Sequence, residues 1–289
     1  MSHVIFDRAL LRARLDRALA GEAADFLLAR AVEDMIERLA TIKRDFANVL
    51  DLGTPGPQLA ESLAREGRSL TRAAPTRKAL GAGLFAGLVA DEEALPFANE
   101  AFDLIVSGLA LQHANDLPGV LVQARRALKP DGLFLAAMIG GQSLSELRAA
   151  FAEAEEEIEG GASPHVAPFA DVRDLGGLLQ RAGFALPVTD TDVVTVRYGN
   201  PFRLFADLRA MGASNALAHR RRKPMSRRLL MRAAEIYAER FADADGRVRA
   251  TFEIMFLSGW APHESQQKPL KPGSAQMRLA DALKAPREG

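Results

Sequence analysis

Apolar residues change their spacing along the chain, and this change predicts the fold class. Over 5–45 they recur every three or four positions, which is typical of amphipathic helices. Short apolar runs then follow at 49–52, 83–90, 102–111 and 133–139, with helical segments or turns between them. Short buried strands that alternate with helices predict an α/β protein whose mostly parallel sheet carries helices on both faces.

The later part of the chain combines further helices with two longer strands. We expect helices at 143–159, 171–182 and across much of 201–241, and strands at 189–198 and 248–260. The pattern divides the chain into an N-terminal helical segment (1–45), an α/β core (46–200), a helical cap with the last strand of the same domain (201–268) and a polar tail (269–289).

Composition narrows the function classes. The 289 residues include 37 Lys and Arg against 37 Asp and Glu, so the formal net charge is zero. That balance argues against a nucleic-acid partner and against a polybasic membrane surface. The absence of Cys excludes disulfides, Cys-ligated metals and thiol catalysis. No apolar run reaches the ~20 residues that a membrane helix needs, and 1–16 is too charged for a signal peptide. We expect a cytoplasmic protein without membrane insertion.

A glycine turn follows the first short strand, in the segment Leu50-Asp51-Leu52-Gly53-Thr54-Pro55-Gly56-Pro57. In an open parallel sheet, ligands bind beside such turns, at the carboxyl ends of the strands. Glycine lets the backbone approach a ligand, and the N–H groups of the turn donate to it. Pro55 and Pro57 have no N–H, so this turn offers fewer donors than a glycine-only turn.

This turn resembles motif I of the class I methyltransferases that use S-adenosylmethionine (SAM), and two further segments support the resemblance. Asp91-Glu92-Glu93 precedes the apolar run at 101–106, and Lys129-Pro130-Asp131-Gly132 precedes the next strand. The resemblance implies a Rossmann-like, seven-stranded, mostly parallel sheet with N-terminal helices and a C-terminal helical cap. It implies SAM as cofactor, with Asp51, Gly53 and Gly56 at the turn and Asp91 and Glu92 beside the adenine. The acidic residue that usually binds the ribose has no counterpart in 68–75.

Other segments resemble a narrower group, the methyltransferase-like assembly factors of respiratory complex I. The segments that carry this resemblance are Ile5-Phe6-Asp7-Arg8, the loop 160–169 with Ser163-Pro164-His165, Met211 to Asn215, and His263-Glu264-Ser265-Gln266. This group includes a mitochondrial protein-arginine hydroxylase, and the malonyl-carrier-protein methyltransferases are more distant relatives. The resemblance covers about 6–275. It implies a protein client, a complex I subunit, that is modified by methyl transfer or by arginine hydroxylation.

Two other functions remain open. Pro55, Pro57 and the missing acidic residue favour a non-catalytic assembly chaperone that has kept the fold and lost SAM binding. A small-molecule methyltransferase of the biotin or quinone type is a third possibility, and it predicts an intact glycine turn.

Three residues are candidates for catalysis. His165 lies in a proline-flanked loop that could close over the strand ends as a lid and act as a base. Alternatively, it fixes that loop by a hydrogen bond. His263 and Glu264 follow the last strand and could serve in acid–base chemistry, or they only cap the strand end. No His-x-Asp or His-x-Glu triplet is present, so we predict no metal site.

Four residues are candidates for substrate binding. Gln112 and His113 follow the run at 102–111, at a position that borders the substrate in the methyltransferase superfamily, or they belong to a helix-capping segment. Asp190 and Asp192 share one face of a strand and could bind a cationic side chain such as arginine. The alternative is the solvated face of an edge strand. The basic run from His219 to Arg228 could bind an acidic partner or lie in solvent at a helix start.

Overall fold

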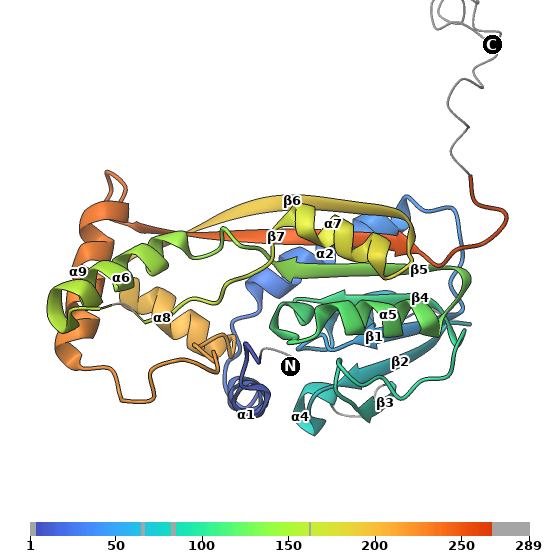
Figure 1. The fold of residues 1–289 in the computed structure, drawn as a ribbon, viewed down its shortest axis with the longest axis horizontal. Coiled ribbons are helices and arrows are strands. Elements are labelled where there is room, and N and C mark those ends of the chain that lie inside the picture. The colour runs from blue at the N-terminus through green and yellow to red at the C-terminus, as the bar shows by residue number, and fades with distance from the viewer. Residues whose placement is uncertain (1–3, 65–66, 82–84, 162, 268–289) are drawn as a thin grey trace, which may run out of the picture.

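The computed structural model describes residues 4–64, 67–81, 85–161 and 163–267, and the predicted polar tail lies outside these ranges. A seven-stranded sheet runs through the molecule in the order β3-β2-β1-β4-β5-β7-β6 (Figure 1). Strands β1 to β5 are mutually parallel, and β7 runs antiparallel to both β5 and β6. The predicted mostly parallel sheet of seven strands is confirmed. The strands are β1 (Asn48–Leu52), β2 (Ser69–Ala74), β3 (Ala86–Val89), β4 (Phe102–Gly108), β5 (Leu128–Ile139), β6 (Ala185–Tyr198) and β7 (Val248–Trp260).

Helices cover both faces of the sheet, as the sequence predicts. On one face, α2 (Phe26–Ala40) and α3 (Gln58–Leu63) pack on the strands through a cluster that includes Met35, Leu59 and Leu104. On the other face, α5 (Leu117–Ala127) and α7 (Val172–Arg181) enclose a cluster that includes Ile105, Leu121 and Leu175. The central strands are apolar on both sides because both faces are covered.

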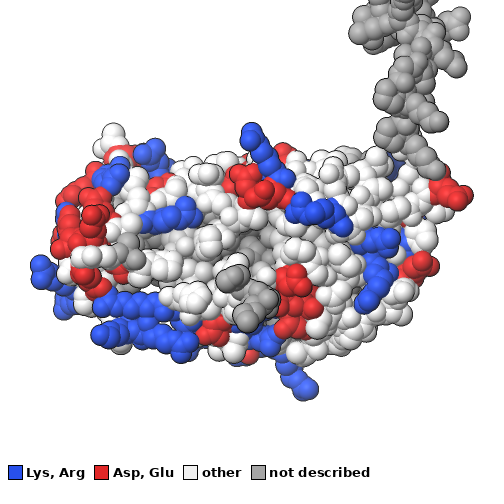
Figure 2. Space-filling view, in the orientation of Figure 1, with Lys and Arg blue, Asp and Glu red and all other residues white. Residues whose placement is uncertain are grey.

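A third cluster holds the helical cap at one end of the sheet. Helices α6 (Ser145–Glu159), α8 (Pro201–Ala210) and α9 (Arg227–Phe241) surround the far ends of the long strands β6 and β7 (Figure 1). Figure 2 shows acidic side chains gathered at this end and basic side chains along its lower edge. Helix α6, which lies within 46–200, packs against α9, and the predicted domain boundaries stay a prediction.

The N-terminal segment joins the core to the cap. Asp7 caps α1 (Arg8–Ala18), with its carboxylate accepting from the N–H of Leu10 at 3.0 Å. Phe6 forms a bridge with Leu217 of the cap, and its N–H donates to Asn115 of the core at 2.8 Å. The remaining helices are short, α4 (Arg77–Leu80) and the 3-10 turn η1 (Leu111–His113). Within the described ranges, no helix has the length and apolarity that crossing a membrane requires.

Candidate functional site

A cavity of about 730 Å³ lies between the core, α1 and the cap. The core contributes the turn after β1 and the segment after β4, so the cavity lies at the carboxyl ends of the parallel strands, where α/β proteins bind ligands. Of the predicted site residues, the cavity is lined by Gly53, Gly56, Glu92, Gln112, His113 and His165. These residues share one cavity, and their roles in binding or catalysis stay predictions.

A buried arginine of the neighbouring strand fixes the turn after β1 by hydrogen bonds. Arg72 lies in β2 directly beside Asp51 of β1, and its Nε donates to the Asp51 carboxylate at 2.9 Å. Its Nη2 donates to the carbonyl oxygens of Thr54 at 3.0 Å and of Gly56 at 2.7 Å, and its Nη1 donates to that of Leu80 at 2.8 Å. These bonds fix the backbone of the turn and occupy the acidic residue that motif I supplies.

Asp51 is buried and does not line the cavity. Its side chain is 1% exposed, and it is not among the residues that line the cavity. Burial raises the pKa of this carboxyl group, and the neighbouring Arg72 guanidinium opposes the shift. The ion pair fixes Asp51 in place through one carboxylate oxygen, and the other oxygen is buried without a hydrogen-bond partner among the described residues.

Gly53 is required by its surroundings. Its φ is +77°, and a Cβ there would lie 2.9 Å from Glu92 Oε1 and 3.0 Å from the Ala110 side chain. Only glycine combines this φ with so close an approach. The turn thus retains the first glycine of motif I for a structural reason that does not need a ligand.

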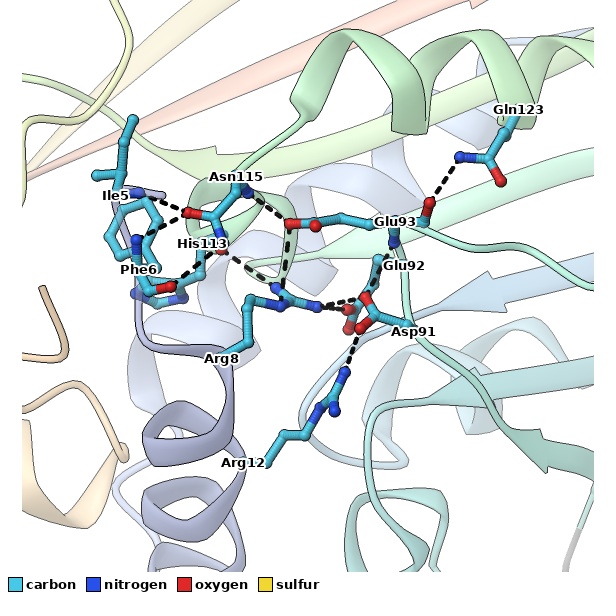
Figure 3. Close-up of polar contacts among 10 residues, drawn as sticks. All are labelled: Ile5, Phe6, Arg8, Arg12, Asp91, Glu92, Glu93, His113, Asn115 and Gln123. Atoms are coloured by element: carbon cyan, nitrogen blue, oxygen red, sulfur yellow. Dashed lines mark hydrogen bonds and ion pairs between the residues drawn. The ribbon is translucent and has the colours of Figure 1, made fainter. Parts of the chain in front are cut away.

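The predicted adenine-side residues bind arginines of α1 instead (Figure 3). Arg8 donates to Asp91 at 2.8 Å, and it also pairs with Glu92, whose side chain is only 5% exposed. Arg12 pairs with the second oxygen of Asp91. Burial raises the pKa of Asp91, but the backbone N–H of Glu93 and the two arginines outweigh it and hold that pKa below its usual range. The charges at this side of the cavity are neutralised within the protein.

Gln112 and His113 both face the cavity from η1. The Gln112 amide donates to the carbonyl oxygen of Leu109 at 2.7 Å, and its Oε1 is buried without a partner among the described residues. The ring of His113 lies edge-on to Phe6, with centroids 5.4 Å apart (Figure 3). Burial, and then the charge of Arg8, lowers the pKa of His113 to about 4. His113 is therefore a neutral, packed side chain near neutral pH.

His165 lines the cavity but is already bonded. Its Nε2 lies 2.8 Å from an oxygen of Glu155, a buried residue of α6 that also accepts from the hydroxyl of Ser163 at 2.7 Å. The ring of His165 stacks on Phe151, with centroids 4.4 Å apart. Burial raises the pKa of Glu155, but the bonds from Ser163 and His165 keep it below its usual range. This network fastens the loop to α6, and a catalytic role of His165 stays a prediction.

Four predicted site residues lie away from the cavity. His263 and Glu264 follow β7, which ends beside the start of β5 because the two strands are antiparallel. They are therefore at the opposite end of the parallel strands from His165, and an acid–base role of either residue stays a prediction. Asp190 and Asp192, on edge strand β6, pair with Arg38 and Arg30 of α2. They form ion pairs on the surface of an edge strand, and a role in binding a cationic substrate stays a prediction.

Sequence reasoning missed two arginines that shape this site. Arg72 lies in the mostly buried strand β2, and a buried charged residue requires a partner nearby. Asp51, directly opposite on β1, is that partner. Arg8 lies in the N-terminal segment, whose position over the strand ends depends on tertiary packing and has no local signal. No group of three or more His, Cys, Asp or Glu in the described ranges is placed to hold a metal ion.

The residues present do not fit SAM. The strand that usually ends in the ribose-binding acid ends here in Ala74, and Pro75 lines the cavity. Pro55 and Pro57 remove two backbone donors from the turn, and Arg72 occupies Asp51. The anchors for the ribose and for the methionine end are thus missing or already bonded.

Comparison with known proteins defines the family. A family model described as "Methyltransferase domain" matches residues 24–187. The mitochondrial arginine-hydroxylase NDUFAF5 of Danio rerio is 40% identical over 97% of this chain and 90% of its own length. The malonyl-[acyl-carrier protein] O-methyltransferase of Gallionella capsiferriformans is 35% identical over 91% of this chain and 93% of its own.

Solved structures agree on the fold. Phosphoethanolamine N-methyltransferase 2 of Haemonchus contortus, solved with S-adenosylhomocysteine, superposes with a TM-score of 0.51 at 17% identity, over 88% of this chain and 60% of its own. The match of the domain model and the identity to NDUFAF5 lead to one conclusion: this chain belongs to the SAM-dependent methyltransferase family and, within it, to the group that contains the arginine-hydroxylase NDUFAF5.

Proposed function

We propose that this chain is an assembly factor that binds a protein client, a respiratory complex I subunit, without using SAM as a methyl donor. The observation that carries the proposal is the contact of Arg72 with Asp51 and with the carbonyl groups of the glycine turn. An arginine in this position turns a cofactor loop into a fixed structural turn. The similarity to NDUFAF5 over nearly the whole chain supports a client of the same kind.

The charges around the cavity support a binding function over a modification of arginine. A client guanidinium would need a carboxylate to hold it in the cavity. Of the two carboxylates that line the cavity in the described structure, Glu92 is buried and pairs with Arg8. Asp25 is exposed and accepts only from the neutral Gln58 amide at 3.0 Å, so no buried carboxylate of the lining is free to hold a guanidinium. The hydroxylase activity in the name of the relatives is therefore not carried over to this chain.

Calorimetric titration of the purified, cofactor-stripped chain with SAM and with S-adenosylhomocysteine tests the first half of the proposal. We expect no binding up to millimolar concentration. A variant that restores the missing groups, Pro55→Gly with Ala74→Asp, serves as the comparison, and it should bind more tightly than the parent chain. Micromolar binding to the unaltered chain would refute the proposal.

Complementation in cells tests the second half. Complex I assembly is followed on native gels in the source organism after deletion of the gene and after its return. We expect assembly to depend on the chain, with no methyl group or oxygen atom added to the subunits in a chain-dependent way. Mass spectrometry of the purified complex measures that addition, and its detection would show an enzyme in place of a chaperone.

A further inference from the structure

The side of the cavity formed by α1 and the cap is apolar and incompletely filled. Leu11 and Leu15 from α1, Phe205 and Leu208 from α8, and Leu230 from α9 all line it, and each is only partly buried. Large apolar side chains that stay half-exposed inside a cavity lose contacts that an occupant would supply. The volume of about 730 Å³ is in the range of small-molecule sites, roughly 300–1,000 Å³.

The cavity opens to the surface beside two apolar residues. Phe202, at the start of α8, is 43% exposed, and Met225, just before α9, is 41% exposed. Both also line the cavity. Exposed apolar side chains at the entrance of an apolar cavity mark a path for an apolar group.

One lining cation has no partner. Among the charged residues that line the cavity, Arg8 pairs with Glu92 and Arg12 pairs with Asp91. His165 is bonded to Glu155. Arg209, in the last turn of α8, lines the same cavity, and its side chain makes no ion pair or hydrogen bond with any other described residue. An arginine beside an apolar cavity is suited to an anionic head group, because its guanidinium binds carboxylates through two parallel hydrogen bonds.

We propose that this cavity binds a single-chain amphiphile with a carboxylate head, of the fatty-acid class. The alkyl chain lies between α1, α8 and α9, and the carboxylate is held by Arg209. The proposal goes beyond the proposed function, since it depends neither on the identity of the client nor on the absence of SAM. The ligand uses the cap side of a cavity that the turn after β1 lines as well.

The test compares three probes of equal chain length by calorimetry on the full chain, all below their micelle-forming concentrations. Dodecanoate carries the proposed head group, dodecanol carries no charge, and dodecyltrimethylammonium carries the opposite charge. We expect dodecanoate to bind about tenfold more tightly than the other two, in line with the strength of a charge-assisted hydrogen bond. Equal affinity of the anionic and cationic probes would overturn the assignment of the head group.

Two variants locate the ligand, and a third is the control. Arg209→Gln should weaken dodecanoate about tenfold and leave dodecanol unchanged. Ala206→Phe, at an exposed position of α8 that lines the cavity, should weaken both. Arg203→Gln lies on the same helix outside the lining and should change neither. Circular dichroism confirms that each variant is folded.

The outcomes distinguish a failure of the amphiphile site from a failure of the Arg209 anchor and from a failure of the proposed function. If none of the three probes binds, as would happen if the cavity received a segment of the client, the amphiphile site is refuted. If Arg209→Gln binds dodecanoate as tightly as the parent chain, Arg209 is not the anchor. Micromolar SAM binding would refute the proposed function, and it would leave the preference among the alkyl probes as it is.

Discussion

Arg72 Nε lies 2.9 Å from a carboxylate oxygen of Asp51, and both side chains are almost wholly buried, at 2% and 1% exposure. Asp51 on β1 and Arg72 on β2 lie directly opposite each other, next to the glycine turn that follows β1. A buried ion pair of this kind contributes little net stability, because desolvation offsets the attraction, but removing one partner leaves an uncompensated charge. The pair thus makes the turn dependent on Arg72.

Removing Arg72 alone should therefore be strongly destabilising. Arg72→Met leaves Asp51 buried without a cation and frees the carbonyl groups of Thr54 and Gly56, and we expect a loss of about 3–5 kcal/mol in the free energy of unfolding. Urea denaturation followed by circular dichroism measures it. The double variant Asp51→Asn with Arg72→Met removes the charge together with its partner and should be less damaging than the single one. A single variant within about 1 kcal/mol of the parent chain would contradict this account.

His113 should make stability depend on pH. Its pKa is lowered to about 4 in the folded chain, below the ordinary value of 6.5. As pH falls below 6.5, His113 becomes protonated in the unfolded chain, whereas in the folded chain it stays neutral down to about pH 4. The free energy of unfolding therefore decreases between pH 6.5 and about pH 4. Between pH 7.5 and pH 5 the loss from this residue is about 2 kcal/mol.

The variant His113→Phe isolates that contribution. It keeps an aromatic ring against Phe6 and has no titratable group. Urea unfolding at pH 7.5 and at pH 5 should show about 2 kcal/mol less loss in the variant than in the parent chain. Equal losses in the two proteins would mean that His113 is protonated in the folded state at pH 5.

Apolar runs predicted every strand except β2, whose sequence Ser-Leu-Thr-Arg-Ala-Ala is half polar and gives no such run. The run at 102–111 contains β4, which ends at Gly108, while Leu111 lies in η1. Gly53 directly follows β1, as expected. Register and direction were harder to predict. That β7 runs antiparallel, and so carries His263 and Glu264 to the far edge, follows from pairing with β5 and β6, which has no local signal in the chain.

Several predicted site residues do share one cavity, but the bonds that they make within the chain could not be predicted from the sequence. Glu92 and His165 do line the cavity, yet each is engaged by a residue distant in the sequence or across a loop, Arg8 and Glu155 respectively. Family patterns identify which positions face a ligand, and they do not show when a side chain of the same chain has taken the ligand's place. The packed N-terminal segment shows that Arg8 pairs with Glu92 (Figure 3).

Arg8 should anchor the N-terminal segment. Its guanidinium is 17% exposed and neutralises Glu92, which is 5% exposed, so Arg8→Met should cost roughly 2–4 kcal/mol of unfolding free energy. We also expect faster amide hydrogen exchange across α1, since the helix loses its main polar contact with the core. Arg17→Met, on the exposed side of the same helix, is the matched control and should change neither quantity. Unchanged exchange in α1 after loss of Arg8 would show that apolar packing alone holds the helix.

Gly212 should be the most sensitive glycine of the cap. Its φ is +73°, and a Cβ there would lie 3.2 Å from the Cα of Leu15, so an added methyl group would press on the backbone of α1. Gly246 is its natural control, because its φ is +78° and a Cβ there would meet nothing within 4 Å. Gly246→Ala should cost about 1 kcal/mol for the left-handed conformation alone. Gly212→Ala should cost at least 1 kcal/mol more, since packing against α1 adds to that strain, roughly as overpacking does in a core. Thermal unfolding of both variants measures the difference, and equal losses would show that α1 yields to the added methyl group.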